Sequence, residues 1–407
     1  MKDCLIIGAG PAGLSAAISA AQNGVDVTVI DEFMKPGGRL LGQLHEEPDH
    51  VWWNGIEEAQ KLFDEVLNQS IDLKLGTSVY HIEKANDNWL VHTNEGIYRG
   101  KTLLVAAGAA ERSIPIPGWT LPGVMSIGAA QVMTNVHQVK PGHNGIVIGI
   151  NVLSLAIARE LQLAGVHLQG IVLPPEHLLT KGVSHPMDVF QSLLHLTHLA
   201  PSPLLKWGGL LAGKSAFIQR LSLQMYPKNG FKLWNISVQM KRVVTEIVGH
   251  EQVQGVKTAD LTASGDIVPG SERTIPVDFV CIAGGLYPLV ELVGVAGCPF
   301  KYIPSLGGHV PIHDERMKTP VDGLFVAGNI TGIESAKVAK AQGHLAGLSI
   351  SEALGKLTEN AEIKRAIEHI EKTREKALIQ FHPDIKKGRK HMETIAADFQ
   401  KKEVSGQ

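Results

Sequence analysis

The chain has few cysteines and no long apolar run. Three cysteines occur in 407 residues, and no two of them form a Cys-x-x-Cys pair. This excludes a disulfide scaffold, a four-thiolate iron–sulfur site and a redox-active dithiol, and it favours a reducing, cytoplasmic setting. No uncharged apolar run reaches the ~18–20 residues that a membrane-spanning helix needs. The first residues also lack the cleavage pattern of a signal peptide, so we expect no transmembrane segment.

Neither sign of charge is in excess. The 38 Lys and Arg residues nearly balance 40 Asp and Glu residues, which leaves a formal net charge of −2. Without a basic excess the chain lacks the field that draws proteins onto nucleic acid, so we expect no nucleic-acid partner. What the chain does contain is 43 Gly, 21 Pro and 44% hydrophobic residues. This is the composition of a globular protein with room for two or three domains.

A glycine motif stands near the start of the sequence. An apolar stretch leads into Gly8-Ala-Gly10-Pro-Ala-Gly13, and an Ala-rich segment and a second apolar stretch then end on Asp31. This order predicts a strand, a tight turn, a helix and a second strand. Gly8 would allow the turn, Gly10 the approach of a pyrophosphate and Gly13 close packing of the helix on the sheet. We therefore expect a dinucleotide site with Asp31 on the adenosine ribose, against the alternative of a chance glycine-rich turn.

A second strand–helix–strand pattern lies at residues 145–173, without the glycines. Gly149 is kept, whereas Asn151 and Ser154 stand where glycines are expected, so a side chain would meet a pyrophosphate here. The following strand ends in Leu-Pro-Pro, with no acid or Arg cluster to bind a ribose or its 2′-phosphate. We therefore expect no NAD(P)H in the usual pose. NAD(P) bound differently, another nucleotide such as ATP, or no nucleotide remain open.

Hydrophobic patterns place further elements along the chain. Segments 77–82 and 89–93 alternate polar and apolar residues beside Asn- and Gly-containing turns, which predicts antiparallel hairpin strands. The Pro- and Gly-rich residues 114–123 have the composition of a domain boundary. The other expected elements are, in chain order, a strand at 103–108, several helices within 174–231, short strands within 233–280, a strand at 323–329 and a helix at 337–354.

The tail from Gly355 to Gln407 differs in composition from the rest. It contains 12 Lys and Arg residues against 9 Asp and Glu residues, a net charge of +3. Ile363, Ile367 and Ile370 fall on one helical face, and Pro383 interrupts the pattern before a second polar helix. Two interpretations remain, a solvated pair of surface helices or a docking element for a partner subunit.

Five motifs occur in the order seen in flavoproteins with two dinucleotide domains. They are Gly8 to Gly13, Asp31, Gly37-Gly38-Arg39, the segment 106–112 and the segment 323–329. Over roughly residues 1–350 the chain resembles the glutathione and thioredoxin reductase superfamily. The resemblance implies an α/β fold with two Rossmann-like dinucleotide-binding domains, the second inserted in the first, and a helical C-terminal tail in addition.

The resemblance also implies a division into domains. A discontinuous FAD-binding domain would comprise residues 1–112 and 275–354. Residues 113–274 would form the degenerate NAD(P)-like domain with a helical insert, and residues 355–407 the helical tail.

FAD is the cofactor that the resemblance implies. Val79 would lie near its adenine, and Gly328 and Asn329 by its ribityl and pyrophosphate groups. Asn329 replaces the usual Asp, but its amide oxygen still accepts a hydrogen bond. The implied FAD-binding residues are Gly8, Gly10, Pro11, Ala12, Gly13, Asp31, Glu32, Gly38, Arg39, Val79, Ala107, Gly108, Gly328 and Asn329.

Four further segments resemble one particular family within this superfamily. Residues 111–123, 204–207, 281–288 and 291–298 look like those of FAD-binding α-type subunits of heteromeric amine-oxidising dehydrogenases. Examples are subunits of hydrogen cyanide synthase, opine oxidase, heterotetrameric sarcosine oxidase, and dye-linked proline and hydroxyproline dehydrogenases. This resemblance implies that a glycine-oxidase-like flavoprotein β subunit oxidises an amino acid, imino acid or opine and passes electrons to this chain.

The resemblance to these α-type subunits also implies further cofactors and partners. An FMN or an iron–sulfur cluster would lie at the subunit junction or on a partner, for example a small ferredoxin-like 2Fe-2S protein. The tail from Gly355 has no cysteine, so such a cluster would have to be held by another polypeptide. The alternatives are a stand-alone NAD(P)H-dependent flavoprotein reductase and a non-catalytic scaffold subunit with a structural FAD.

Other candidate groups have plain structural interpretations. Cys4, Cys281 and Cys298 lie far apart in sequence in apolar surroundings, which favours buried structural thiols. His195 and His198 share a helical face, but no carboxylate ligand is near in sequence, so we predict no metal site.

Two more sets of residues come shortly after sequence motifs whose counterparts approach the flavin in proteins of the superfamily. Trp52 and Trp53, with His45 and His50, would wall the flavin, line a partner surface or pack in the core. Lys337 and Lys340 would either stabilise the reduced flavin or face solvent.

Overall fold

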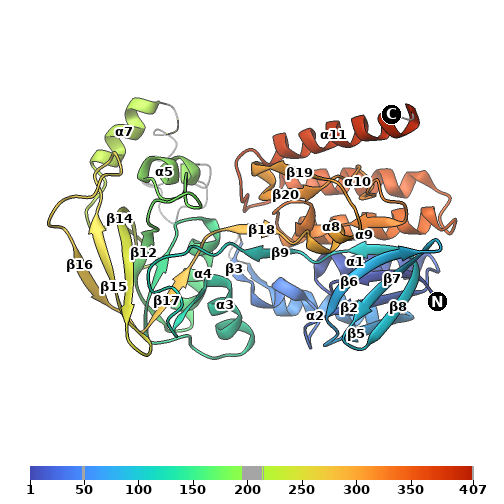
Figure 1. The fold of residues 1–407 in the computed structure, drawn as a ribbon, viewed down its shortest axis with the longest axis horizontal. Coiled ribbons are helices and arrows are strands. Elements are labelled where there is room, and N and C mark those ends of the chain that lie inside the picture. Colours follow the sequence, from blue (N-terminus) through green and yellow to red (C-terminus); the bar gives the residue numbers. More distant parts are fainter. Residues whose placement is uncertain (48–50, 195–212, 214, 406–407) are drawn as a thin grey trace. The chain divides into compact units, whose positions relative to one another are not determined.

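The computed structural model describes residues 1–47, 51–194, 213 and 215–405, which form two compact units (Figure 1). Unit 1 comprises Met1–Gln43, Asn54–Ala110 and Leu286–Gln407, and unit 2 comprises Leu44–Trp53 and Glu111–Gly285. The domain boundaries inferred from the sequence stay a prediction.

Unit 1 is built on a seven-stranded sheet. Its strand order is β5-β2-β1-β8-β7-β6, and β21 pairs with β8. The parallel part comprises β1 (Lys2–Ile7), β2 (Val27–Asp31), β5 (Ile71–Leu75), β8 (Gly96–Val105) and β21 (Leu324–Val326). The antiparallel part comprises β6 (Val79–Ala85), β7 (Asn88–Thr93) and the first half of β8. The predicted hairpin is therefore confirmed.

Two helices pack closely against each other in unit 1. They are α1 (Pro11–Gln22) and α9 (Ala336–Ala353). Their contact depends on glycines, because a Cβ built on Gly343 would lie 2.0 Å from the carbonyl oxygen of Ala12 and one on Gly347 would lie 2.5 Å from that of Ala16. Small residues thus let α1 and α9 approach closely along much of α1.

Unit 2 contains the second sheet, of eight strands. Its order is β10-β17-β11-β12-β14-β15-β16, and β13 pairs with β14. The strands are β10 (Val124–Ser126), β17 (Phe279–Ile282), β11 (Asn144–Ile148), β12 (His167–Leu173), β13 (Phe231–Leu233), β14 (Ile236–Gly249), β15 (Val253–Asp260) and β16 (Arg273–Pro276).

One strand of unit 2 differs from the prediction of short strands. β14 has 14 residues, because it pairs with parallel β12 over its first half and antiparallel β15 over its second half. Figure 1 shows β14, β15 and β16 side by side. Register shifts in both pairings mark β-bulges in this long strand, which also pairs with β13 at its start.

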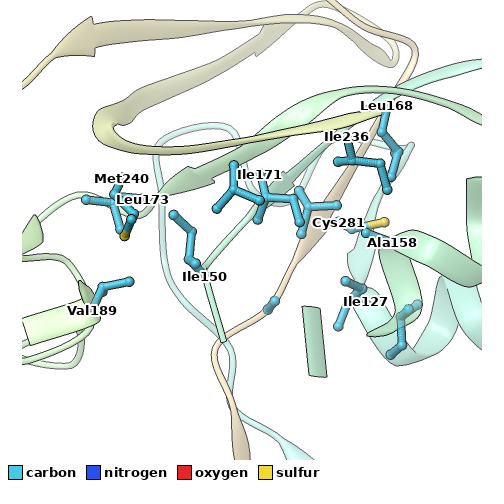
Figure 2. Close-up of a cluster of buried hydrophobic side chains, with 14 of the residues drawn as sticks. Ile127, Ile150, Ala158, Leu168, Ile171, Leu173, Val189, Ile236, Met240 and Cys281 are labelled. Carbon is cyan, nitrogen blue, oxygen red and sulfur yellow. The ribbon is translucent and has the colours of Figure 1, made fainter. Parts of the chain in front are cut away.

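One of the two core clusters of unit 2 lies between its sheet and the flanking helices. Figure 2 shows part of this cluster, in which Cys281 lies among Ile171, Ala158 and Leu168. The helices are α3 (Ile127–Gln131), the π-helix η3 (Val132–Val136), α4 (Val152–Leu163), α5 (Pro186–Leu194) and α7 (Ala216–Gln224). The two mixed sheets, each with a parallel part, and their helices confirm the predicted α/β fold class.

The remaining elements are short, apart from α2 and the tail helices. They are η1 (Gly38–Gly42), β3 (Leu44–Glu46), β4 (Trp52–Asn54), α2 (Gly55–Leu67), β9 (Ala109–Glu111), β18 (Leu286–Pro288), α8 (Glu291–Val295), β19 (Phe300–Ile303), η5 (Pro304–Leu306), β20 (Gly308–Pro311), η6 (Gly328–Thr331), α10 (Asn360–Glu375) and α11 (Ile385–Ser405). Within the described ranges, no helix has both the length and the apolarity to cross a bilayer.

The tail helices belong to unit 1 and pack on the rest of that unit. Ile363 and Ile370 of α10 are buried, and Ile385 and Met392 of α11 join Leu306 in a small apolar cluster. The tail is therefore not only solvated surface, although its outer residues are polar.

Candidate functional site

Two glycines shape the turn after β1 because neighbouring backbone leaves no room for a side chain. Gly8 has φ +105°, and a Cβ there would lie 2.5 Å from the carbonyl oxygen of Ala106. A Cβ on Gly13 would lie 1.8 Å from the carbonyl oxygen of Gly8. The predicted roles of these two glycines, in turn formation and close packing, match the contacts that the structure shows.

Gly10 is different because it faces open space. It is the N-cap of α1 in an extended conformation, with φ −77°, and no described atom lies within 4 Å of a Cβ built there. None of the described side chains caps the helix, and Pro11 supplies no N–H. The N–H groups of Ala12 and Gly13 in the first helical turn have no acceptor within the helix and could donate to a ligand, and the positive end of the helix dipole favours an anion.

Asp31 closes the turn from the end of β2. Its Oδ2 accepts the Ala9 N–H at 2.5 Å and its Oδ1 accepts the Phe33 N–H at 2.8 Å. Burial raises the pKa of Asp31, and these two backbone donors partly oppose the rise. Each carboxylate oxygen keeps lone-pair capacity for a ribose hydroxyl. The neighbouring Glu32 is exposed.

A second glycine turn lies against the first. The Gly37 N–H donates to the carbonyl oxygen of Ala9 at 2.8 Å, and a Cβ on Gly38 would lie 3.1 Å from the Cα of Gly10. Arg39 donates from Nε to the carbonyl oxygen of Ala109 at 3.0 Å. This bond ties the second glycine turn to the segment that follows β8.

The segments after β8 and β21 complete the cluster. Ala107 and Gly108, shortly after β8, are half-buried, and a Cβ on Gly108 would meet no described atom within 4 Å. Gly328 has φ +80°, and a Cβ there would lie 2.8 Å from the Cβ of Ala12. The last predicted motif therefore lies directly beside the start of α1.

Asn329 and Gln342 organise the loop after β21. The Asn329 Oδ1 accepts the Glu334 N–H at 3.2 Å, and Gln342 Oε1 accepts the Gly328 N–H at 3.0 Å. The buried Nε2 of Gln342 has no partner among the described residues.

Val79 and Thr77 lie on the other side of Asp31. Val79 begins β6 and is half-buried. The Thr77 N–H donates to the carbonyl oxygen of Asp31 at 2.9 Å, and its buried hydroxyl likewise lacks a partner in the described part of the chain. The sequence analysis missed Thr77 and Gln342, because no motif distinguishes a buried Thr or Gln from any other.

The equivalent position in unit 2 is closed by side chains. Asn151, at the N-cap of α4, accepts the Ser154 N–H at 3.0 Å, and the Ser154 hydroxyl accepts the Asn151 N–H at 2.9 Å. The Asn151 amide also donates to the carbonyl oxygen of Ala283 at 2.9 Å. This capping box satisfies donors that a pyrophosphate would otherwise use.

A buried acid in the same helix was also missed. Glu160 accepts hydrogen bonds from the Gln131 and Asn135 amides, each at 2.8 Å, and from the Leu44 N–H at 3.2 Å. Burial raises the pKa of Glu160 to about 7, although the three donors oppose the rise. On sequence alone Glu160 resembles any helix-surface acid.

The secondary candidates have different surroundings. Trp52 is 46% exposed, and the half-buried Trp53 stacks on His45 with ring centroids 6.1 Å apart, so neither Trp is fully buried in the core. Lys337 and Lys340 are both exposed on α9. Three further candidates, His50, His195 and His198, lie outside the described residues.

All three cysteines are free and buried. Burial raises the pKa of Cys4 to about 12 and that of Cys298 to about 11, and it raises the pKa of Cys281 further. A thiol needs its thiolate to act as a nucleophile. The cysteines therefore lack the chemistry of a disulfide reductase, in agreement with the prediction of structural thiols.

The cluster around α1 fits a dinucleotide. The space at Gly10 would be filled by a single Cβ, the uncapped helix start offers donors to a diphosphate, and Asp31 offers acceptors to a ribose. The partnerless polar atoms of Thr77 and Gln342 lie next to Asp31 and Gly328 respectively, where a bound molecule would supply partners.

Known proteins with similar sequences include subunits of opine oxidase and of hydrogen cyanide synthase. An opine oxidase subunit of Agrobacterium tumefaciens is 29% identical over 360 residues, which cover 85% of this chain and 65% of the relative. Hydrogen cyanide synthase subunit HcnB of Pseudomonas protegens is 26% identical over 369 residues, which cover 89% of this chain and 72% of the relative.

A solved structure shares the fold. L-proline dehydrogenase from P. horikoshii superposes with a TM-score of 0.63 at 19% sequence identity, covering 90% of this chain and 58% of that chain. This chain thus spans less than two thirds of the length of the opine oxidase relative and of the proline dehydrogenase chain.

The family model described as pyridine nucleotide-disulphide oxidoreductase matches residues 2–191 and 222–343. The match covers most of both units. The chain therefore belongs to the pyridine nucleotide-disulphide oxidoreductase family, whose members are FAD-dependent oxidoreductases, as the order of the glycine motifs predicted.

Proposed function

We propose that this chain is the FAD-binding subunit of a heteromeric dehydrogenase or oxidase that acts on an amino acid, imino acid or opine. In this proposal the chain accepts reducing equivalents from a partner subunit that oxidises a secondary amine. One observation carries the proposal. The helix start is open in unit 1, whereas its counterpart in unit 2 is occupied by the chain's own side chains.

The two helix starts can be compared position by position. Asn151 stands where unit 1 has Gly10, and Ser154 stands where unit 1 has Gly13. Gly10 offers empty space, whereas Asn151 is held by bonds to Ser154 and to the Ala283 carbonyl. A pyrophosphate at α4 would have to displace these bonds, which argues against a soluble nicotinamide nucleotide as the electron source of this chain.

Each part of the proposed FAD would be bound by different residues of the chain. The N–H groups of Ala12 and Gly13 would bind the diphosphate, Asp31 the ribose, and Val79 would contact the adenine. Glu32, Gly38, Arg39, Ala107, Gly108, Gly328 and Asn329 would line the rest of the site. Bound there, FAD would supply two-electron redox chemistry, while the chain supplies position and electrostatics.

The relatives support the assignment to a complex. The opine oxidase and hydrogen cyanide synthase relatives are both named as subunits. L-proline dehydrogenase, which shares the fold, acts on L-proline. By analogy the partner would be a glycine-oxidase-like flavoprotein β subunit, with FMN or a 2Fe-2S protein as a further carrier. The three reduced cysteines favour a cytoplasmic setting.

Anaerobic flavin spectroscopy tests the proposal. The purified chain should carry FAD that dithionite bleaches but NADH and NADPH do not. After co-expression with its genomic neighbours, adding sarcosine, L-proline or an opine should bleach the flavin and reduce an artificial dye. Rapid bleaching of the isolated chain by NADPH would overturn the proposal in favour of a stand-alone reductase.

The same flavin spectroscopy distinguishes an electron-accepting subunit from a non-catalytic scaffold subunit with a structural FAD. A scaffold subunit would keep its FAD oxidised while the complete complex turns over with amine and dye.

The Asn151→Gly/Ser154→Gly variant provides a matched control for unit 2. If the capping box excludes a nicotinamide nucleotide, this variant should bind NADPH more tightly than the wild-type chain.

A further inference from the structure

Three potential metal ligands meet on the outer face of the hairpin in unit 1. They are His81 and Glu83 of β6 and His92 of β7, and their ligand atoms all lie within 4.8 Å of one another. His81 and His92 are directly opposite in the antiparallel register, with ring centroids 5.2 Å apart. The His92 Nε2 and the Glu83 Oε1 are 2.9 Å apart.

We propose that His81, Glu83 and His92 form a binding site for a divalent transition-metal ion such as Zn²⁺. Two imidazoles and a carboxylate are donors that zinc accepts, with bonds of about 2.0–2.2 Å. Ligand atoms this close need only side-chain rotations to converge on one ion. Because Glu83 already holds His92 by a hydrogen bond, the ion would replace a proton between two groups that are in place.

The hairpin holds these side chains on a rigid support. Ile82 and Val91 pair on the opposite face of the same two strands and are fully buried, as is Trp89 of β7. Alternation along a strand sends His81 and Glu83 to the outer face when Ile82 points inward. The backbone under the ligands is therefore fixed before an ion binds, which lowers the entropic cost of binding.

The site is partly open to solvent. The side chain of His92 is 19% exposed and that of Glu83 is 48% exposed. Three protein ligands leave a fourth tetrahedral position for water or for a group from another molecule. With mixed nitrogen and oxygen donors, Cu²⁺ should bind more tightly than Zn²⁺, and Mn²⁺ more weakly. None of the three ligands is among the residues proposed to bind FAD, so metal binding can be tested without the flavin.

Zinc titration of the untagged full chain tests the site. The chain competes with a chromophoric chelator for Zn²⁺, and we expect one ion per chain with a dissociation constant in the micromolar range or below. His81→Ala and His92→Ala should each weaken binding at least about tenfold, since even the loss of an outer partner of a metal ligand costs 10–100-fold. Co²⁺ should give visible absorption bands in the wild type that are absent in His92→Ala.

A matched control uses another histidine of unit 1. His309 of β20 is exposed beside Tyr302, and His309→Ala should leave zinc binding unchanged. Zinc should raise the melting temperature of the wild type and of His309→Ala, but not of the His81→Ala/His92→Ala variant. The proposal is wrong if this double variant binds Zn²⁺ as the wild type does, or if the wild type binds it only at millimolar concentration.

Discussion

At the residue scale, the glycines of the α1 turn have separate physical roles. Gly8 and Gly13 are required by the protein itself, because a side chain at either position would overlap a backbone carbonyl. Gly10 is not required by the protein, since a Cβ there meets no atom of the described residues and its φ of −77° suits any residue. The lack of a side chain at Gly10 should therefore matter only for the binding of a ligand.

Two substitutions separate these roles. Gly10→Ala should leave the melting temperature of the flavin-free chain unchanged but lower FAD affinity at least about tenfold, because the methyl group fills ligand space. Gly13→Ala should lower both stability and FAD affinity. Calorimetry of the flavin-free chains and fluorescence titration with FAD measure the two effects. Full FAD affinity in Gly10→Ala would contradict the proposed site.

Glu160 illustrates a residue whose environment sets its chemistry. Its folded pKa of about 7 lies above the ordinary value of 4.5, so between these values the folded state holds a proton that the unfolded state has released. Stability should therefore fall as pH rises from about 4.5 to 7 and level off above that. The expected loss is about 3 kcal/mol.

The Glu160→Gln variant checks this pH dependence. It cannot ionise, so its unfolding free energy should lose the decline that the wild type shows over this interval. Urea unfolding at a series of pH values, followed by a signal from unit 2, measures the slope. The exposed acid Glu176 is a suitable control in Glu176→Gln, which should keep the wild-type slope.

At the element scale, the tail helices hold the loop that follows Gly328. Arg374 of α10 donates from Nε to Glu334 at 2.5 Å, and Arg389 of α11 is also paired with Glu334. Arg389 donates to the carbonyl oxygen of Thr331 at 2.7 Å as well. Burial alone would raise the pKa of Glu334, but the two guanidinium groups together lower it. The tail thus stabilises a loop of the proposed flavin site.

Removal of one arginine should loosen this loop. Arg389→Met leaves a buried carboxylate with one partner, and breaking a buried pair in this way costs about 3 kcal/mol or more. We expect faster hydrogen exchange over residues 328–335 and weaker FAD retention. Adding Glu334→Gln should restore part of the stability, whereas Lys390→Met, at the exposed neighbouring position, should change little.

At the scale of the whole molecule, the same strand–turn–helix arrangement occurs once in each unit with opposite consequences. In unit 1 the turn is lined by glycines and the helix start is open. In unit 2 two polar side chains form a capping box at the corresponding helix. One fold therefore provides one candidate nucleotide site and one self-capped helix, which is the basis for assigning electron supply to a partner protein.

The cysteines give a prediction for the chain as a whole. All three are buried, and burial raises their pKa values, so the native protein should show no thiol that reacts rapidly with Ellman's reagent. Guanidinium chloride should expose three reactive thiols per chain. A fast-reacting thiol in the native protein would reopen the possibility of thiol–disulfide chemistry.

Local sequence patterns were sufficient for much of the fold. The first strand, α1 and β2, the β6–β7 hairpin and α9 were predicted at nearly their observed bounds, because apolar periodicity and turn residues act over short distances. β14 was not predicted at its full length, because its 14 residues are fixed by pairing with three other strands, β12, β13 and β15. Pairing with distant strands leaves no signal within the segment itself.

A single difference at a known spacing, Gly10 against Asn151, was enough to distinguish the turn that the chain's own side chains leave open from the one that they close. The amino-acid order also sufficed to show that the cysteines form no paired thiol motif. Folding of the complete chain was needed to bring Arg374 and Arg389 onto Glu334, to bury Glu160, and to make the histidines and the acid of the β6–β7 hairpin converge. Contacts between distant segments and the burial of charge depend on packing throughout the chain, which no local pattern encodes.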